Sequence, residues 1–217
     1  MYPYEAIVFD LDGTLVDSLQ DIADAMNRTL QHFGYPVFPT DTYRYFVGNG
    51  LRTLVWKSLP EDKKAEKYVD ETLIVMMSEY GKTTVNKTVL YPGIPELLDA
   101  SVQRGYKLAV LSNKADSLTQ KIVAKLLNKW TFDIVLGASE RFPRKPDPEA
   151  AIYISDQMNI SANQFLYLGD TGVDMQTANA AGMYPVGVTW GFRAREELIE
   201  NGAQLIIDKP EELIPKL

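Results

Sequence analysis

Two aspartates stand one residue apart at the end of a short apolar segment near the start of the chain. The segment is Ala6 to Phe9, and Asp10, Leu11, Asp12 and Gly13 follow it. Four apolar residues are too few for a helix and suit a strand buried on both faces of a parallel sheet. Because side chains alternate along an extended chain, Asp10 and Asp12 should point the same way. The ligand crevice of an open parallel sheet lies beyond the carboxyl ends of its strands, so this pattern predicts an acidic pair in that crevice.

An Asp-Gly pair is also the strongest short signal for a β-hairpin turn, which would make the two acids incidental. A hairpin requires a second alternating strand directly after the turn. Instead, apolar residues recur at helical spacing behind an Asp-Ser pair typical of a helix N-cap. These apolar residues are Leu19, Ile22, Ala23, Met26 and Leu30. The pattern therefore favours a strand followed by a helix.

The rest of the chain divides into a helical block and an alternating block. From residue 17 to about residue 85 the pattern is helical, whereas beyond Leu90 apolar strands alternate with helices. Strands are expected at residues 106–111, 132–136, 165–168 and 185–188. This alternation predicts a Rossmann-like parallel α/β sheet flanked by helices. We expect an α/β catalytic core domain of residues 1–16 and 86–217 and an inserted all-helical cap domain of residues 17–85, which would act as a lid.

The composition excludes several classes of function. With 29 acidic and 22 basic residues the net charge is -7, which argues against nucleic acid or an anionic membrane as a partner. The chain has no cysteine, which excludes disulfides, thiolate metal sites and cysteine nucleophiles. The N-terminus lacks the features of a signal peptide, and no apolar run approaches the ~20 residues of a membrane span. We therefore expect a cytoplasmic protein, and the sequence leaves open whether it is a monomer or homodimer.

Polar side chains that could do chemistry follow the ends of several expected strands. They are Asp10 with Asp12, Ser112, Lys145, and Asp170 with Asp174. Each downstream group has a simpler explanation by itself. Ser112 could cap a helix, Lys145 could be a solvated loop cation, and the stretch G-D-T-G-V-D could be a turn that caps its helix.

Taken together, these stretches resemble the haloacid dehalogenase superfamily of phosphohydrolases. The signature D-x-D-G-T-x-x-D begins at Asp10, and the family order then continues with Ser112, Lys145 before a proline, and G-D-x-x-x-D from Gly169. The resemblance covers essentially the whole chain. It implies an α/β core with a helical cap between the first and second motifs, and a Mg²⁺-dependent phosphatase that acts on a small phosphorylated metabolite.

Charge gives a separate argument for a metal ion. Asp10, Asp12, Asp170 and Asp174 would converge with only Lys145 to neutralise them, and unpaired carboxylates in a crevice are costly. A divalent cation is therefore implied. Because no cysteine is present and no histidine lies near these motifs, the ligands would be oxygens only, and few carboxylates plus a phosphate suit Mg²⁺ better than Ca²⁺.

The resemblance also implies roles for the catalytic residues. Asp10 would attack phosphorus and form an aspartyl-phosphate. Asp12 would protonate the leaving alkoxide and then activate the hydrolytic water. Ser112 would donate a hydrogen bond to a phosphoryl oxygen, and Lys145 would offset charge on the phosphate and on Asp10.

The same resemblance assigns the binding groups. The main-chain N–H groups of Leu11, Asp12 and Asn113 would bind the phosphate. Mg²⁺ would be held by the Asp10 carboxylate, the Asp12 main-chain carbonyl and the Asp170 carboxylate. Asp174 would bind the metal through water or steer Asp170.

Substrate choice must come from the helical block, where the signal is weaker. The stretch V-G-N-G-L-R, residues 47–52, resembles the cap loop of phosphoglycolate phosphatase-like members of the superfamily. Arg52 could meet a substrate carboxylate, or it could be a solvated arginine at a helix N-terminus. Two alternatives to the phosphatase are a β-phosphoglucomutase-like phosphomutase, which shares every core motif, and a non-catalytic phosphometabolite-binding module on the same fold.

Overall fold

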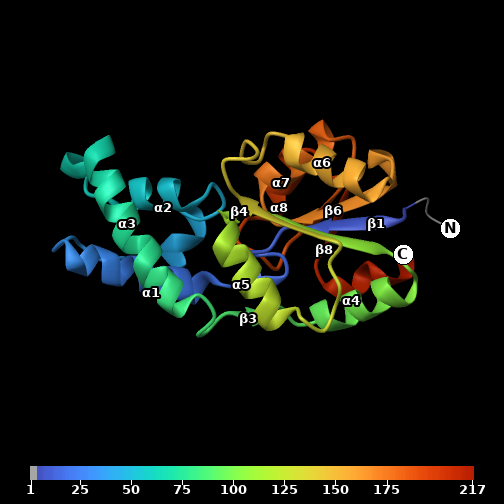
Figure 1. The fold of residues 1–217 in the computed structure, drawn as a ribbon, viewed down its shortest axis with the longest axis horizontal. Coiled ribbons are helices and arrows are strands. Elements are labelled where there is room, and N and C mark those ends of the chain that lie inside the picture. The colour runs from blue at the N-terminus through green and yellow to red at the C-terminus, as the bar shows by residue number, and fades with distance from the viewer. Residues whose placement is uncertain (1–3) are drawn as a thin grey trace.

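A six-stranded parallel sheet forms the centre of the larger part of the molecule (Figure 1). The computed structural model describes residues 4–217. The strand order is β5-β4-β1-β6-β7-β8, and every neighbouring pair is parallel. The strands are β1 (Ala6–Phe9), β4 (Lys107–Ala115), β5 (Ile134–Ala138), β6 (Phe165–Gly169), β7 (Tyr184–Val188) and β8 (Leu205–Ile207). The expected Rossmann-like α/β fold is confirmed.

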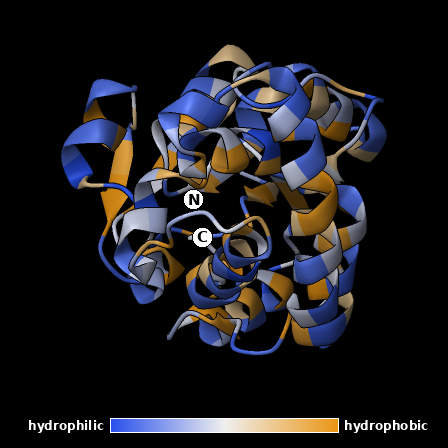
Figure 2. Ribbon diagram, turned by 90° about the vertical axis from the view of Figure 1, so that its left-hand side faces the viewer, coloured by the Kyte–Doolittle hydropathy of each residue, from blue (hydrophilic) through white to orange (hydrophobic). Residues whose placement is uncertain are grey.

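Helices cover both faces of this sheet, which explains why β1 is wholly apolar. Ile7 and Phe9 pack into the apolar cluster shared with α4 and α5, whereas Ala6 and Val8 pack into the cluster shared with α6 and α7. This division follows from the alternation of side chains along a strand. Figure 2 shows the hydrophobic strands enclosed by helices whose outer surfaces are hydrophilic. The helices are α4 (Ile94–Gln103), α5 (Asp116–Leu126), α6 (Glu149–Met158) and α7 (Gly172–Ala180).

Three strands of the central sheet differ from the sequence-based prediction by more than one residue. Strand β5 begins and ends two residues later than the predicted range of 132–136. Strand β4 continues through Ser112 to Ala115, and its pairing with β5 shifts register between Leu111 and Ala115. The prediction ended the strand at its first polar residue, but these polar side chains are buried because they face the site described below. The edge strand β8 was not predicted, since only three residues form it. The core is completed by α8 (Arg195–Glu200) and short 3-10 helices at Ala162–Gln164, Pro210–Glu212 and Ile214–Lys216.

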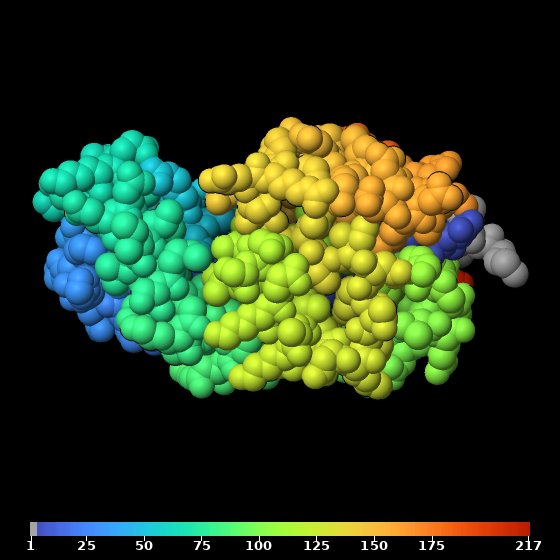
Figure 3. Space-filling model, in the orientation of Figure 1, coloured from blue at the N-terminus to red at the C-terminus, as the bar shows by residue number. Residues whose placement is uncertain are grey.

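The helical block lies at one end of the molecule, beside the core (Figures 1 and 3). It contains α1 (Leu19–His32), α2 (Leu51–Ser58) and α3 (Glu66–Thr83), with 3-10 helices at Thr40–Tyr45 and Glu61–Lys63. The three α-helices and the 3-10 helix at Thr40–Tyr45 share an apolar cluster, which Leu118 and Phe192 of the core also join. The short antiparallel strands β2 (Val16–Asp17) and β3 (Val89–Leu90) form its connection to the core. Within residues 4–217, no helix has the length and apolar character that crossing a bilayer requires.

Candidate active site

Three buried aspartates meet where neighbouring strands end. Asp10 follows β1, Asp170 follows β6, and Asp174 lies in the first turn of α7. One carboxylate oxygen from each lies within 4.8 Å of the others. Because β1 and β6 are adjacent parallel strands, their carboxyl ends bring Asp10 and Asp170 to the same edge of the sheet. Three of the four acids that were predicted to converge therefore form one cluster, and Asp12 is not part of it.

Asp170 is fixed by the turn that follows β1. Its Oδ1 accepts a hydrogen bond from Thr14 Oγ1 at 3.2 Å, and its Oδ2 accepts one from the Phe192 main-chain N–H at 2.8 Å. Gly13 has φ +98°, and a β-carbon at this position would lie 2.2 Å from Asp170 Oδ2. Gly13 thus supplies both the turn and the space for Asp170.

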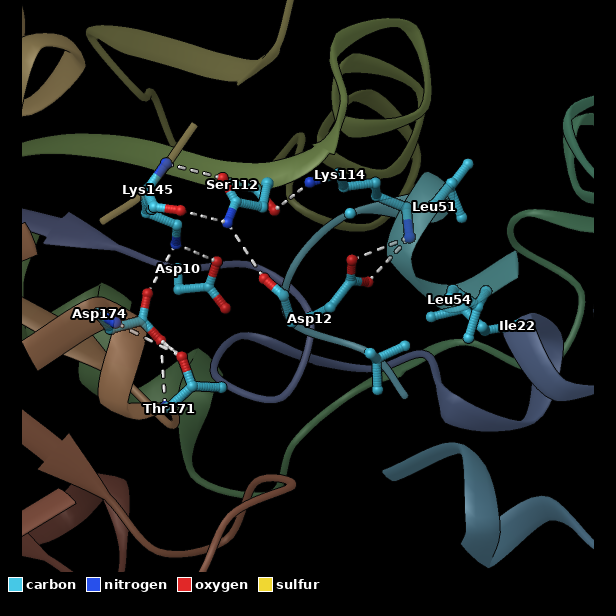
Figure 4. A pocket seen from close by; sticks show the side chains of 14 residues that line it. Asp10, Asp12, Ile22, Leu51, Leu54, Ser112, Lys114, Lys145, Thr171 and Asp174 are labelled. Atoms are coloured by element: carbon cyan, nitrogen blue, oxygen red, sulfur yellow. Dashed lines mark hydrogen bonds and ion pairs between the residues drawn. The ribbon is translucent and has the colours of Figure 1, made fainter. Parts of the chain in front are cut away.

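Lys145 joins two of the acids in the buried cluster (Figure 4). Its Nζ donates hydrogen bonds to Asp10 Oδ1 at 2.8 Å, to Asp174 Oδ1 at 2.6 Å and to the Leu111 carbonyl at 2.9 Å. Burial opposes the charge of this lysine, but Asp10 and Asp174 outweigh that effect and hold the pKa of Lys145 well above its usual value. The interpretation of Lys145 as a solvated loop cation is wrong.

Asn113 positions Lys145 through the backbone. Its Oδ1 accepts a hydrogen bond from the Lys145 N–H at 3.0 Å, and its Nδ2 donates to the Lys145 carbonyl at 3.1 Å. The same Nδ2 lies 3.1 Å from the carbonyl of Gly48 in the helical block. Asn113 therefore links strand β4, the Lys145 loop and the loop before α2.

Asp174 both caps its helix and completes the acidic cluster. Its Oδ2 accepts hydrogen bonds from the Thr171 N–H at 3.1 Å and from Thr171 Oγ1 at 2.7 Å, while the Asp174 N–H donates to Thr171 Oγ1 at 3.4 Å. This reciprocal arrangement is a capping box at the start of α7. The prediction that G-D-T-G-V-D caps its helix is thus correct. Asp174 caps the helix and belongs to the acidic cluster at the same time.

The raised pKa values of the buried carboxyl groups are what a site for a cation should show when the cation is absent. Burial raises the pKa of Asp10 to about 7, with Asp174 adding to the effect and Lys145 opposing it. Burial, reinforced by Asp10 and Asp174, also raises the pKa of Asp170 well above its usual value. The donors are carboxylate oxygens in a buried, crowded group, and this donor chemistry suits a hard divalent ion.

Asp12 stands apart from the other acids and contacts a different lysine. Its Oδ1 and Oδ2 accept hydrogen bonds from Lys114 Nζ at 3.0 and 2.9 Å, and Ser18 Oγ donates to Oδ1 at 2.5 Å. Figure 4 shows the Asp12 carboxylate turned toward Lys114. The expectation that Lys145 alone neutralises the acids is therefore wrong. Strand alternation could have identified Lys114, because residues two apart share a face and Ser112 was already placed at the site.

A small pocket lies between the acids and the helical block (Figure 4). It encloses about 40 Å³. The core side contributes Asp10, Asp12, Ser112, Asn113, Lys114, Lys145, Thr171 and Asp174, and the side chains on the opposite wall are Ile22, Val47, Leu51 and Leu54. The pocket is therefore polar on the core side and apolar on the other.

Three predicted site residues lie outside the lining of this pocket, and one of them, Asp170, belongs to the acidic cluster beside it. Arg52 pairs on the surface with Glu66 and, at 2.6 Å, with Asp70, so the structure does not bring Arg52 to the other site residues. Leu11 follows Asp10 directly, and its side chain is fully buried in the core cluster. Its predicted contribution is a main-chain N–H, which requires no side chain in the pocket.

The fold and the site together define a class of protein, an α/β enzyme whose acidic cluster at the strand ends lies under a helical block. The model of the haloacid dehalogenase-like hydrolase family matches residues 7–188. The chain belongs to this family.

Similar proteins agree with this assignment. A phosphoglycolate phosphatase of Colwellia psychrerythraea is 34% identical, covering 98% of this chain and 96% of the relative. A phosphoglycolate phosphatase of Aquifex aeolicus is 36% identical, covering 86% and 85% respectively. The structure of a haloacid dehalogenase-like hydrolase from Streptococcus pneumoniae superposes with a TM-score of 0.88 at 28% identity, covering 100% of this chain and 99% of the other. The expectation of an enzyme in the phosphoric monoester hydrolase class is confirmed.

Proposed function

We propose that the chain is a Mg²⁺-dependent phosphatase that hydrolyses phosphoglycolate or a similarly small phosphomonoester through an aspartyl-phosphate on Asp10. The contact of Lys145 Nζ with both Asp10 and Asp174, beside Asp170, carries this proposal. This contact brings three groups together at one edge of the sheet: a carboxylate nucleophile, a cation for the phosphoryl group and a set of metal ligands.

The metal ligands are proposed from the donor chemistry. The carboxylates of Asp10 and Asp170 and the main-chain carbonyl of Asp12 would hold Mg²⁺. Asp174 is engaged by Lys145 and Thr171, which suits an indirect role, through water or through positioning. A bound Mg²⁺ supplies positive charge that offsets the phosphoryl oxygens.

The chain's own residues then divide the reaction into two steps. In the first, an Asp10 oxygen attacks phosphorus, the ester P–O bond breaks, and Asp12 gives a proton to the leaving alkoxide. In the second, Asp12 takes a proton from water as that water attacks the aspartyl-phosphate, which releases phosphate and restores the Asp10 carboxylate. Ser112 and Lys145 would hold the phosphoryl oxygens throughout.

The main-chain N–H groups of Leu11, Asp12 and Asn113 are proposed as further phosphate donors. Asp12 and Asn113 line the pocket, which supports this role for their backbone. Donors fixed in the backbone need no reorganisation when charge develops on the phosphoryl oxygens, so they would contribute to binding in both steps.

Two observations support a small substrate. The pocket encloses only about 40 Å³. Residues 17–85 are proposed to act as a cap that must move to admit a ligand. The curated relatives that share about a third of their sequence with this chain are named phosphoglycolate phosphatase. A cytoplasmic location stays a prediction.

The test is the variant Asp10→Asn, assayed with Mg²⁺ for phosphate release from phosphoglycolate and from p-nitrophenyl phosphate. We expect the rate on both substrates to fall by roughly 10³-fold or more, because the nucleophile is lost. Asp24→Asn, a change of a half-buried residue of α1 that pairs with Lys87 outside the pocket, is the control and should keep the parental rate. Turnover of the aryl phosphate by Asp10→Asn at the parental rate would falsify the assignment. Isomerisation of a sugar phosphate without release of phosphate would instead identify a phosphomutase.

A further inference from the structure

Lys114 is a buried cation that the proposed mechanism does not use. Only 2% of its side chain is exposed. Besides both oxygens of Asp12, its Nζ contacts the Tyr80 hydroxyl at 2.5 Å and lies 4.4 Å from the centre of the Tyr80 ring. Tyr80 is a fully buried residue of α3 in the helical block. Lys114 is therefore held between an acid of the core and a side chain of the proposed cap.

The two lysines that line the pocket, Lys114 and Lys145, pair with different carboxylates. Lys145 is paired with Asp10 and Asp174, and the proposed reaction keeps both of these beside it. Among residues 4–217, the carboxylate paired with Lys114 is Asp12. Asp12 is also the side chain that must reach the leaving oxygen of the substrate. When Asp12 turns to do so, Lys114 loses its anion, and a buried cation without a partner is strongly unfavourable.

Among residues 4–217, no acidic side chain lines the facing wall of the pocket. The side chains there are Ile22, Val47, Leu51 and Leu54, which can neither pair with a lysine nor bind sugar hydroxyls (Figure 4). Arg52, the cation that the sequence suggested for substrate binding, is engaged by Glu66 and Asp70 outside the pocket. The anion that compensates Lys114 must therefore come with the ligand.

We propose that Lys114 binds a carboxylate on the leaving-group half of the substrate, in exchange for Asp12. This inference rests on the proposed function and names the residue that makes the site selective for short phosphorylated hydroxy acids. The exchange replaces one carboxylate at Lys114 with another, so the charge beside the lysine stays balanced. Asp12, released from Lys114, takes up a proton from water and passes it to the leaving oxygen. An alkyl phosphate without the carboxylate either leaves Lys114 unpaired or leaves Asp12 where it is, and both outcomes lower its kcat/KM.

The first test compares phosphoglycolate with ethyl phosphate, whose leaving group lacks the carboxylate. The parent enzyme should prefer phosphoglycolate. Lys114→Met should lower kcat/KM for phosphoglycolate by roughly 10- to 100-fold, the range expected for a hydrogen bond to a charged group, and should change ethyl phosphate far less. The matched control is Lys107→Met, at the other end of β4, where the lysine pairs with Asp133 on the surface. An equal loss on both substrates would mean that Lys114 only positions Asp12, and the inference would be wrong.

The second test measures binding without turnover. With Mg²⁺ present, calorimetry compares 3-phosphonopropionate with propylphosphonate, which carries a methyl group in place of the carboxylate. The parent should prefer the carboxylate, Lys114→Met should lose that preference, and Tyr80→Phe, which keeps the lysine, should retain most of it. Equal affinity of the parent for the two phosphonates would overturn the inference. A parent enzyme that hydrolyses neither phosphoglycolate nor p-nitrophenyl phosphate would instead refute the proposed function, and the binding preference would still report on Lys114.

Discussion

The side chain of Asp170 occupies the space that a β-carbon at position 13 would need, since the two would be 2.2 Å apart. Gly13→Ala should therefore displace Asp170 and weaken Mg²⁺ binding and Mg²⁺-dependent phosphate release by roughly 100-fold or more. The control is Gly34→Ala. Gly34 also has a positive φ, of +70°, but a β-carbon there would meet nothing within 4 Å. That variant should lose ~1–2 kcal/mol of stability to backbone strain and keep its activity. Equal losses of activity in the two variants would assign the effect to strain alone.

Asp10 and Asp170 hold protons more tightly in the folded, metal-free protein than in the unfolded chain. Burial raises the pKa of Asp10 from 3.8 to about 7 and acts in the same direction on Asp170. Between about pH 4 and 7 the folded state therefore binds more protons than the unfolded state. The stability contributed by these groups is greatest at low pH and falls as the pH rises through that window.

A metal ion that replaces those protons should bind more tightly as the pH rises. We expect the apparent Mg²⁺ affinity to increase between pH 5 and 7 by up to ~10-fold per pH unit for each proton displaced. The Mg²⁺-induced increase in Tm, measured at several pH values, reports this dependence. Asp170→Asn should flatten it, and a Mg²⁺ affinity that does not change across this range would contradict the assigned ligands.

At the scale of elements, one carboxylate of α1 clamps the segment that returns from the helical block to the core. The main-chain N–H groups of Asn86, Lys87 and Thr88 all donate to Asp21, and the Thr88 hydroxyl does so as well. Asp21 is 1% exposed. Three successive backbone donors in this segment therefore depend on a single side chain.

Removal of that side chain should destabilise the connection. Asp21→Ala leaves the three N–H groups without this acceptor and should lower the free energy of unfolding by ~3 kcal/mol or more, measured by urea denaturation. Asp24→Ala on the same helix is the control, because Asp24 pairs with the exposed ammonium of Lys87. That change should cost less than ~1 kcal/mol. Similar losses in the two variants would show that the clamp adds nothing beyond a surface ion pair.

For the whole molecule, two arginines connect the core to the proposed cap on the side of the loop after β7. Arg193 donates to the carbonyls of Arg44 and, at 2.7 Å, of Val47, and Arg44 donates in return to the carbonyl of Gly191 at 3.1 Å. These bonds hold the loop before α2 against the core, where Val47 lines the pocket. They therefore favour the arrangement in which the pocket is covered.

Loss of this connection should let the cap open more often. Arg193→Met should speed amide hydrogen exchange in residues 44–51 by roughly tenfold and raise KM several-fold, because two hydrogen bonds to a charged group are lost. Arg195→Met is the control, since Arg195 pairs with Asp208 within the core. Unchanged exchange in residues 44–51 would show that other contacts hold the cap in place.

Local patterns were enough to predict most of the core. Strands β1 and β6 are apolar runs that lead directly to Asp10 and Asp170, and β7 is a third apolar run close to its predicted place. The edge strand β8 escaped prediction because three residues carry too little periodicity. The end of β4 was misplaced because burial of polar residues at a site contradicts the usual strand pattern.

The sequence by itself determined the order of the motifs, the parallel sheet and the acids and lysine that meet at its edge, because strand ends and tight turns are encoded by neighbouring residues. Only the tertiary structure decided which partner each charge finds. Lys114 contacts Asp12, 102 positions away, and Tyr80, 34 positions away. Arg52 instead forms ion pairs with acids of the helical block. Contacts between distant segments depend on how the helical block packs against the core. No local pattern in the chain records that packing.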